Sequence, residues 1–204
     1  MNSVKVIDHG WERIMSEVAL MDKSYTKVGF PLGVELGRAS KKKVTQFAGK
    51  EKYSGISEVA SVAMFHEFGT KQTVTPKQAG YLGAMGLHVK PGKTLVTPAR
   101  PFMSTSFDEA QSDLNILRNK LYIAIVKGKT TTILALKIMG EFMTARTKKK
   151  IKEIKSPPLH PFTIANKKSS KPLIDTGQMI NSVNHVEVLS RHGSIGKVTG
   201  RSFI

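Results

Sequence analysis

Two long helices are predicted by the stretch STSFDEAQSDLNILRNKLYIAIVKGKTTTILALKIMGEFMTARTKKKIKEIK, residues 104–155. Apolar residues recur every three or four positions before Gly128 and again after it, which is typical of helices that bury one face. The first stripe consists of Phe107, Ala110, Leu114, Leu117, Leu121 and Ile125, and the second of Leu134, Ile138 and Phe142, with Ala135 and Met139 beside it. We expect Ser104 or Ser106 to cap the first helix. The second runs from about Thr130 to Lys155, where Pro157-Pro158 ends it.

Shorter elements are predicted on both sides of this pair. Residues 10–22 have helical spacing, residues 25–36 alternate like a strand, and Ser57 begins a helix that Gly69 ends. Near the C-terminus, Asp175 or Thr176 caps a short helix, and residues 183–189 alternate again. We therefore expect one α+β domain over 1–204, with a small antiparallel sheet packed against the two long helices and shorter helices around them.

Three segments are expected to be extended loops. They are a basic loop at about 38–55, an inserted loop or hairpin at about 71–97, and a mobile loop at about 159–172. Each is rich in lysine, glycine, proline or serine, which is typical of connections between packed elements.

The composition is strongly basic. The 204 residues include 32 Lys plus Arg against 15 Asp plus Glu, a net charge of +17. Such an excess predicts a polyanionic or acidic neighbour, although a solvated basic surface that maintains solubility is the alternative. The lysine runs Lys41, Lys42, Lys43 and Lys148, Lys149, Lys150 are the candidate contacts. No aromatic residues interleave with them, so contact with nucleic acid would involve the backbone and read no sequence.

Motifs for catalysis or cofactor binding are incomplete in this sequence. The Gly-Lys-Thr triplets at 92–94 and 128–130 lack the glycine five positions earlier, where Leu87 and Ile123 stand. His66-Glu67 lacks the second histidine of a zinc helix, because residue 70 is Thr70. The chain has no cysteine and no Gly-x-Ser-x-Gly elbow. We expect no enzyme activity, no cofactor and no metal.

No apolar run approaches the length of a membrane-spanning helix, and residues 1–8 lack the layout of a secretory signal. We expect no membrane partner and assembly in a cytoplasm.

Two short stretches look selected for packing. They are His66-Glu67-Phe68-Gly69-Thr70 and Pro98-Ala99-Arg100-Pro101-Phe102. Pro101 restricts the backbone of Arg100 and so directs its guanidinium. Our hypothesis is that Arg100 pairs with Glu67 and holds the start of the long helix on the preceding helix, with Phe68 and Phe102 packed around the pair. The alternative is an Arg100 free in solvent.

These stretches, followed by Pro172-Leu173-Ile174-Asp175-Thr176-Gly177-Gln178-Met179 with Ser182-Val183, resemble the virion morphogenesis and tail-completion proteins of tailed double-stranded-DNA phages. This group includes neck proteins and minor tail protein Z-like proteins. Pro157-Pro158-Leu159 and Thr163-Ile164 are also similar, so the resemblance spans about residues 57–190. Residues 38–55 and 71–97 match no part of the family pattern.

The resemblance implies a structural virion subunit without a catalytic site. It would form a ring, as a hexamer, between the head-tail adaptor or portal and the tail tube or sheath, with a channel for genomic DNA. The matching positions imply structural or interface roles for Glu67, Phe68, Gly69, Thr70, Arg100, Pro101, Phe102, Asp175, Thr176 and Gly177. The alternative from another class is a nucleic-acid-binding accessory protein without sequence specificity.

Overall fold

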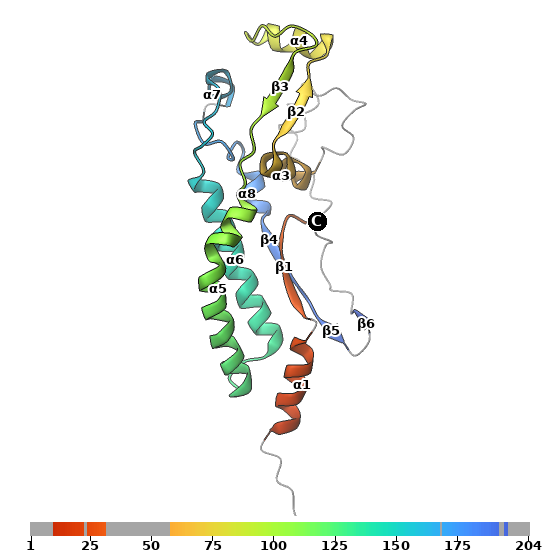
Figure 1. The fold of residues 1–204 in the computed structure, drawn as a ribbon, viewed down its shortest axis with the longest axis vertical. Helices are drawn as coiled ribbons and strands as arrows, with labels where there is room; N and C mark the ends of the chain where they lie inside the picture. The colour runs from red at the N-terminus through yellow and green to blue at the C-terminus, as the bar shows by residue number, and fades with distance from the viewer. Residues whose placement is uncertain (1–9, 23, 32–57, 168, 192–193, 196–204) are drawn as a thin grey trace, which may run out of the picture.

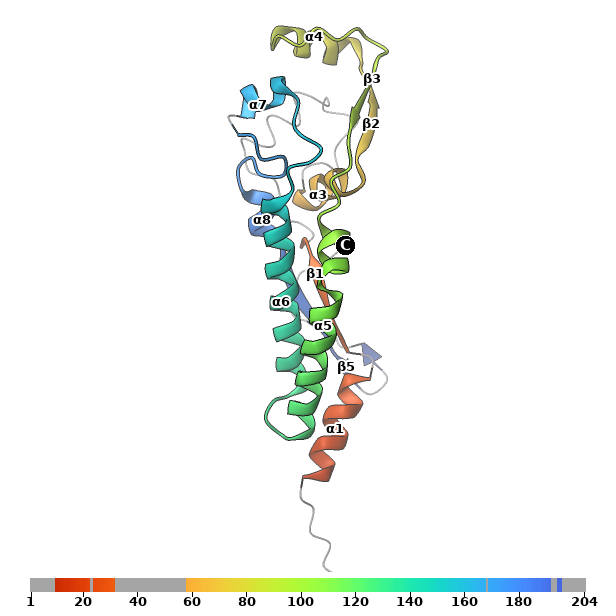
Figure 2. The same ribbon diagram turned by 60° about the vertical axis from the view of Figure 1, so that its left-hand side comes forward.

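The computed structural model describes residues 10–22, 24–31, 58–167, 169–191 and 194–195. The molecule is elongated, and two long helices run along its long axis (Figure 1). A short helix, α1 (Trp11–Met21), lies at one end, and an arm of two strands and a helix projects at the other (Figures 1 and 2). Helices with a small antiparallel sheet confirm the predicted α+β class.

The two long helices are α5 (Met103–Val126) and α6 (Thr132–Glu153), close to the predicted boundaries. Thr131 caps α6, because its hydroxyl accepts a hydrogen bond from the amide of Leu134 at 3.3 Å. The predicted serine cap of α5 is wrong: Phe102 occupies the N-cap position and makes no side-chain cap. Between the helices, the buried hydroxyls of Ser106 and Thr147 form a hydrogen bond of 3.1 Å.

The central sheet consists of β1 (Tyr25–Gly29) and β4 (Asn184–Val188), paired antiparallel with Tyr25 opposite Val188. It packs mainly on α6 rather than on both long helices. Gly140 of α6 permits this approach, because a Cβ there would lie 2.5 Å from the His185 ring and 2.8 Å from Thr26 Oγ1. Residues 32–36 of the predicted strand lie outside the described residues.

The hydrophobic core lies where the end of α6 meets α3 (Val59–Phe68) and α8 (Gln178–Ser182). Glu58, rather than the predicted Ser57, occupies the N-cap position of α3. The core also receives residues from the start of α5 and the end of β1. Its fully or nearly fully buried members are Phe30, Val59, Ala60, Ala63, Phe102, Ile151, Leu173, Met179, Ile180 and Val183.

The predicted inserted loop at 71–97 is a hairpin arm with a helix at its tip. Strands β2 (Thr70–Thr73) and β3 (Thr94–Thr97) pair antiparallel, and α4 (Pro76–Ala84) connects them. Thr75 and Gln78 form a reciprocal capping box, with Pro76 in the first turn.

The remaining elements are short. α7 (Pro161–Lys167) occupies part of the predicted mobile loop, which is therefore partly helical. β5 (Ser190–Arg191) and β6 (Ser194–Ile195) pair antiparallel near α1. The predicted basic loop at 38–55 lies outside the described residues. Among the residues that are described, no helix is long and apolar enough to cross a membrane.

Candidate functional site

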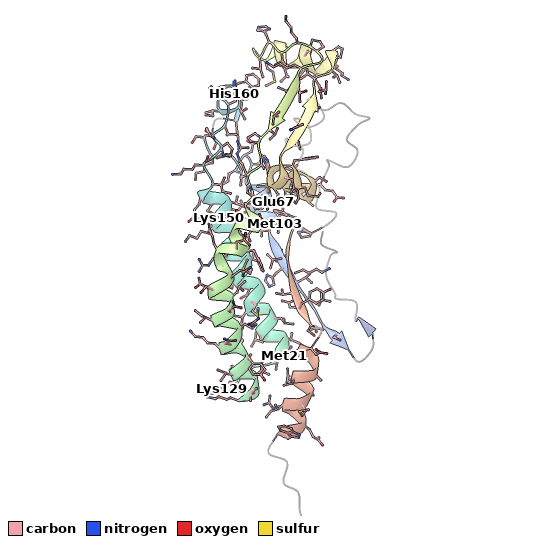
Figure 3. The ribbon with its side chains drawn as sticks, in the orientation of Figure 1. Met21, Glu67, Met103, Lys129, Lys150 and His160 are labelled. Carbon is pink, nitrogen blue, oxygen red and sulfur yellow. The ribbon has the colours of Figure 1, made fainter. Side chains whose placement is uncertain are left out.

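Glu67 anchors the junction of α3 and α5. Its carboxylate accepts hydrogen bonds from the amides of Phe102 at 2.8 Å, Met103 at 2.9 Å and Ser104 at 3.0 Å. The Ser104 hydroxyl adds a fourth, at 2.7 Å. Figure 3 shows Glu67 beside Met103 at the head of α5. A negative charge at this position satisfies amides that have no partner within the helix and complements the helix dipole.

Arg100 does not pair with Glu67, so that hypothesis is wrong. Its Nε and Nη2 atoms instead donate to the carbonyl oxygen of Pro157, at 3.0 and 2.8 Å, and Nη2 approaches that of Pro158 at 3.4 Å. The Arg100 backbone amide donates to the His66 carbonyl at 2.7 Å. The planar guanidinium thus connects the segment after α6 to the segment before α5. The start of α5 is held on α3 as predicted, but by Glu67 and backbone amides rather than by an ion pair with Arg100.

The two phenylalanines predicted around this pair differ sharply. Phe102 is fully buried and meets Phe30 edge to face, with ring centroids 6.0 Å apart. Phe68, by contrast, is 75% exposed at the end of α3, so its predicted packing is wrong. Pro101 is exposed as well.

Gly69 has a backbone conformation that only glycine adopts readily. Its φ is +71° and its ψ is 171°, and a Cβ would lie 2.8 Å from both Ala99 N and Thr97 O. Thr70 follows as the first residue of β2, opposite Thr97. The turn therefore sends the chain from α3 directly into the arm.

His66 is partly buried, feels the positive charges of Arg100 and Lys167, and is neutral at pH 7. Burial, followed by the charges of Arg100 and Lys167, lowers its pKa to about 4. Its buried Nδ1 has no hydrogen-bond partner within the described structure. A protonated His66 would add a third positive charge here, so the junction disfavours that form.

The third motif stretch lies at the start of α8. Gly177 is its N-cap with φ +77°, and the Thr176 hydroxyl accepts a long hydrogen bond, 3.4 Å, from the Gln178 amide. Gly177 rather than Asp175 or Thr176 is therefore the N-cap, and no side chain caps α8, so the predicted cap is wrong. Asp175 is exposed. Met179 and Ile180 then enter the same core as Phe102, so the three motif stretches converge on one junction.

The predicted lysine cluster on α6 is partly occupied in joining the long helices. Lys150 pairs with Glu109 of α5, and Lys149 lies 3.7 Å from Glu153 one turn along α6. Arg146 pairs with Asp113 nearby. Lys148 makes no ion pair among the described residues. Lys41, Lys42 and Lys43 lie outside the described part of the chain.

A different basic surface lies on the arm, and the sequence reasoning missed it. The arm carries four exposed lysines, Lys71, Lys77, Lys90 and Lys93, and residues 68–107 contain no aspartate or glutamate. α7 lies at the same end of the molecule, within residues 154–174, which also lack acids (Figure 2). The signal was the absence of acids over these long stretches rather than a run of lysines.

An apolar groove of about 560 Å³ lies at the opposite half of the molecule. β1 and the end of α1 line one side, α5 lines the other, and α6 forms the floor. The lining residues are mostly apolar: Met21, Ser24, Tyr25, Thr26, Val28, Phe107, Leu114, Arg118, Leu121, Tyr122, Ile125, Thr132, Ala135, Leu136, Met139 and Met143. Arg118 is its charged member.

Further apolar side chains are exposed on the helices that line this groove, several of them on other faces of those helices. They include Trp11, Met15 and Val18 of α1, Ile116, Ile123 and Val126 of α5, and Ile133 and Leu134 of α6. Single exposed apolar residues are ordinary, but Tyr25, Phe107 and Tyr122 are exposed within the lining of one groove, and a continuous apolar lining of this kind marks an interaction surface.

The described residues contain no group of three or more histidine, aspartate or glutamate side chains placed to hold a metal ion. Comparison of the chain with protein-family models, curated proteins and solved structures gives no match.

Proposed function

We propose that this chain is a structural subunit of a tailed-phage virion, a neck or tail-completion protein. Copies assemble into a ring, as a hexamer, that joins the tail tube or sheath to the head-tail adaptor or portal. Genomic DNA passes through its channel, and the chain carries out no catalysis. The phage assignment rests on the three motif stretches that resemble that family.

The observation that carries the self-assembly part is the apolar surface around the groove. The apolar side chains that line the groove would cost free energy in water, at about 25 cal/mol for each Å² left uncovered. An interface between copies would bury them. A head-to-tail contact that closes on rotation gives a ring.

The junction supports the same proposal from a different direction. Glu67, Gly69, Arg100 and Phe102 serve to set the angles between α3, the arm and α5. Fixed angles between these elements suit a subunit of a ring, because a ring closes only if each copy presents its two contact surfaces at a constant angle.

The test is the assembly state of the purified full-length chain, measured by light scattering and by electron microscopy without nucleic acid. We expect discrete rings of constant mass over a tenfold range of concentration. A chain that stays monomeric at high concentration and is absent from purified particles contradicts the proposal.

A second candidate is a nucleic-acid-binding accessory protein, which the acid-free basic arm favours. Its lysines would contact phosphates without reading sequence. Replacing Lys71, Lys77, Lys90 and Lys93 by glutamine should then abolish retention of duplex DNA. Ring formation by this variant would show that it still folds. If the wild type retains no duplex DNA, the second candidate fails.

A further inference from the structure

The groove described above has the features of a site for an amphipathic helix. Its wall on α5 extends from Phe107 to Ile125, and its floor on α6 extends from Thr132 to Met143. At 1.5 Å per residue, the floor is about 16 Å long, which is the length of a three-turn helix. Because its lining is apolar apart from a few hydroxyls and Arg118, an occupant would contribute an apolar stripe and an acidic group.

Helix α1 presents such a stripe. Trp11, Met15 and Val18 lie on one face at helical spacing and are 65%, 48% and 36% exposed. No residue of α1 is buried. Asp22, four residues after Val18, continues the same face and is exposed.

The charges of the two surfaces are complementary. Residues 11–22 carry Glu12, Glu17 and Asp22 against Arg13, so this segment is acidic in a chain of net charge +17. Arg118 and Asp22 make no ion pair among the described residues. Arg118 is the charged residue of the groove lining, so an acidic segment such as α1 with Asp22 complements it.

We propose that α1 of one copy docks its Trp11–Met15–Val18 face into the groove of a neighbouring copy, with Asp22 next to the neighbour's Arg118. This inference rests on the proposed self-assembly and names the surface that performs it. The stripe and the groove are different surfaces of one chain, so the contact is head-to-tail and repeats from copy to copy.

α1 is held within its own copy through Glu17, which lies on a different face from the exposed stripe. The Glu17 carboxylate accepts a hydrogen bond from the Thr132 amide at 2.7 Å, and the Thr132 hydroxyl donates to the Glu17 carbonyl at 3.0 Å. Met21, the last residue of α1, lines the groove in its own copy. Figure 3 labels Met21 at the end of α1 that is nearer the long helices. Successive copies therefore meet at a continuous apolar seam.

The absence of cysteine from the chain makes cross-linking a clean test. Met15→Cys and Leu114→Cys are made as separate full-length variants, mixed, and treated with a short bismaleimide. We expect a covalent dimer containing one copy of each variant. The double variant should give a ladder of oligomers that ends at the size of the ring.

Ser16→Cys is the matched control, because Ser16 is exposed on the same helix but points away from the stripe. It should cross-link to Leu114→Cys several-fold less than Met15→Cys does. In a second test, Asp22→Arg or Arg118→Glu alone should weaken association roughly tenfold, and the two together should restore it.

The outcomes separate this inference from the proposed function. If rings form but Met15→Cys cross-links no better than the control, and Val18→Glu assembles like the wild type, another surface joins the copies and the inference is overturned. If Leu114→Cys in isolated monomers resists maleimide, the chain's own residues fill the groove, which also overturns it. If the wild type never assembles, the proposed function fails as well.

Discussion

Replacing Glu67 by alanine removes the group that receives three backbone amides and one hydroxyl at the head of α5. Losing an ordinary helix cap costs about 1 kcal/mol, and a partly buried charge on the helix dipole adds up to about 2 kcal/mol. Water can reach Ser104, which is exposed, but not Phe102, which is fully buried. The free energy of unfolding should therefore fall by about 3 kcal/mol.

Glu67→Gln separates charge from shape. Its amide oxygen can still accept from one or two of the amides, but its NH₂ group then faces a donor. We expect the free energy of unfolding to fall by about half as much as in Glu67→Ala. The measurement is urea unfolding at one fixed protein concentration, because assembly shifts apparent stability. With a slope of about 2 kcal/mol/M, Glu67→Ala should lower the midpoint by about 1.5 M.

The control is Glu109→Gln, which removes a carboxylate that is 58% exposed and pairs with Lys150. Exposed pairs contribute about 0–1 kcal/mol, so this variant should be close to the wild type. Equal losses in Glu67→Ala and Glu109→Gln would show that the cap contributes no more than a surface ion pair, and the account of the junction would be wrong.

Three further variants test other contacts by the same unfolding measurement. Arg100→Lys keeps the charge but loses the planar fork on Pro157, so it should cost about 1–2 kcal/mol, and a wild-type midpoint would contradict the contact. Gly140→Ala places a Cβ 2.5 Å from the His185 ring and should cost about 1–3 kcal/mol, whereas Gly80→Ala, with open space around it, should not. The lowered pKa of His66 means that the unfolded chain binds its proton more readily, so stability should fall as the pH drops from 6.5 towards 4, by about 2 kcal/mol at pH 5. His66→Gln should remove that part of the pH dependence, and an unchanged profile would contradict it.

The spacing of apolar residues was sufficient to predict the elements that depend on local sequence alone. The stripes on α5 and α6 gave their extents to within a few residues, because a long helix must bury one face. α4 was missed, although Thr75, Pro76 and Gln78 carry the signature of a helix start. The glycines and prolines around α4 are typical of a loop, so the sequence analysis predicted a loop or hairpin there.

The contacts at the junction could not be predicted, because their partners are distant in sequence. Ser104 looked like a local cap, yet Glu67, which lies 37 residues earlier, satisfies the amide of Ser104. Arg100 was assigned to the nearest acid, whereas its partner is a carbonyl oxygen 57 residues later. A backbone carbonyl carries no residue signature, so no sequence pattern identifies it as a partner.

The groove lies beyond sequence reasoning for a related reason. The apolar stripe of α5 predicts a face that is covered, but not what covers it. Leu114 and Leu121 face the groove, and Phe107 is half exposed, because the sheet packs on α6 and leaves this side of α5 open. Only the three-dimensional arrangement shows that the described elements leave part of their apolar surface uncovered.

The sign of the salt dependence distinguishes the two functions considered for this basic chain. Copies that each carry a charge of +17 repel one another, and raising the salt from about 0.1 M to 1 M shortens the screening length from about 10 Å to 3 Å. Association through an apolar groove with one ion pair should therefore hold or tighten as salt rises. Binding to DNA phosphates through the four lysines of the arm should weaken by roughly a hundredfold between about 50 and 200 mM salt, because counterions are released on binding. If the copies meet at the groove, the fraction of the chain assembled into rings should therefore hold or rise across a salt series in which any DNA retention falls. Rings that dissociate as salt rises would mean that charge pairs, rather than the apolar seam, hold the copies together.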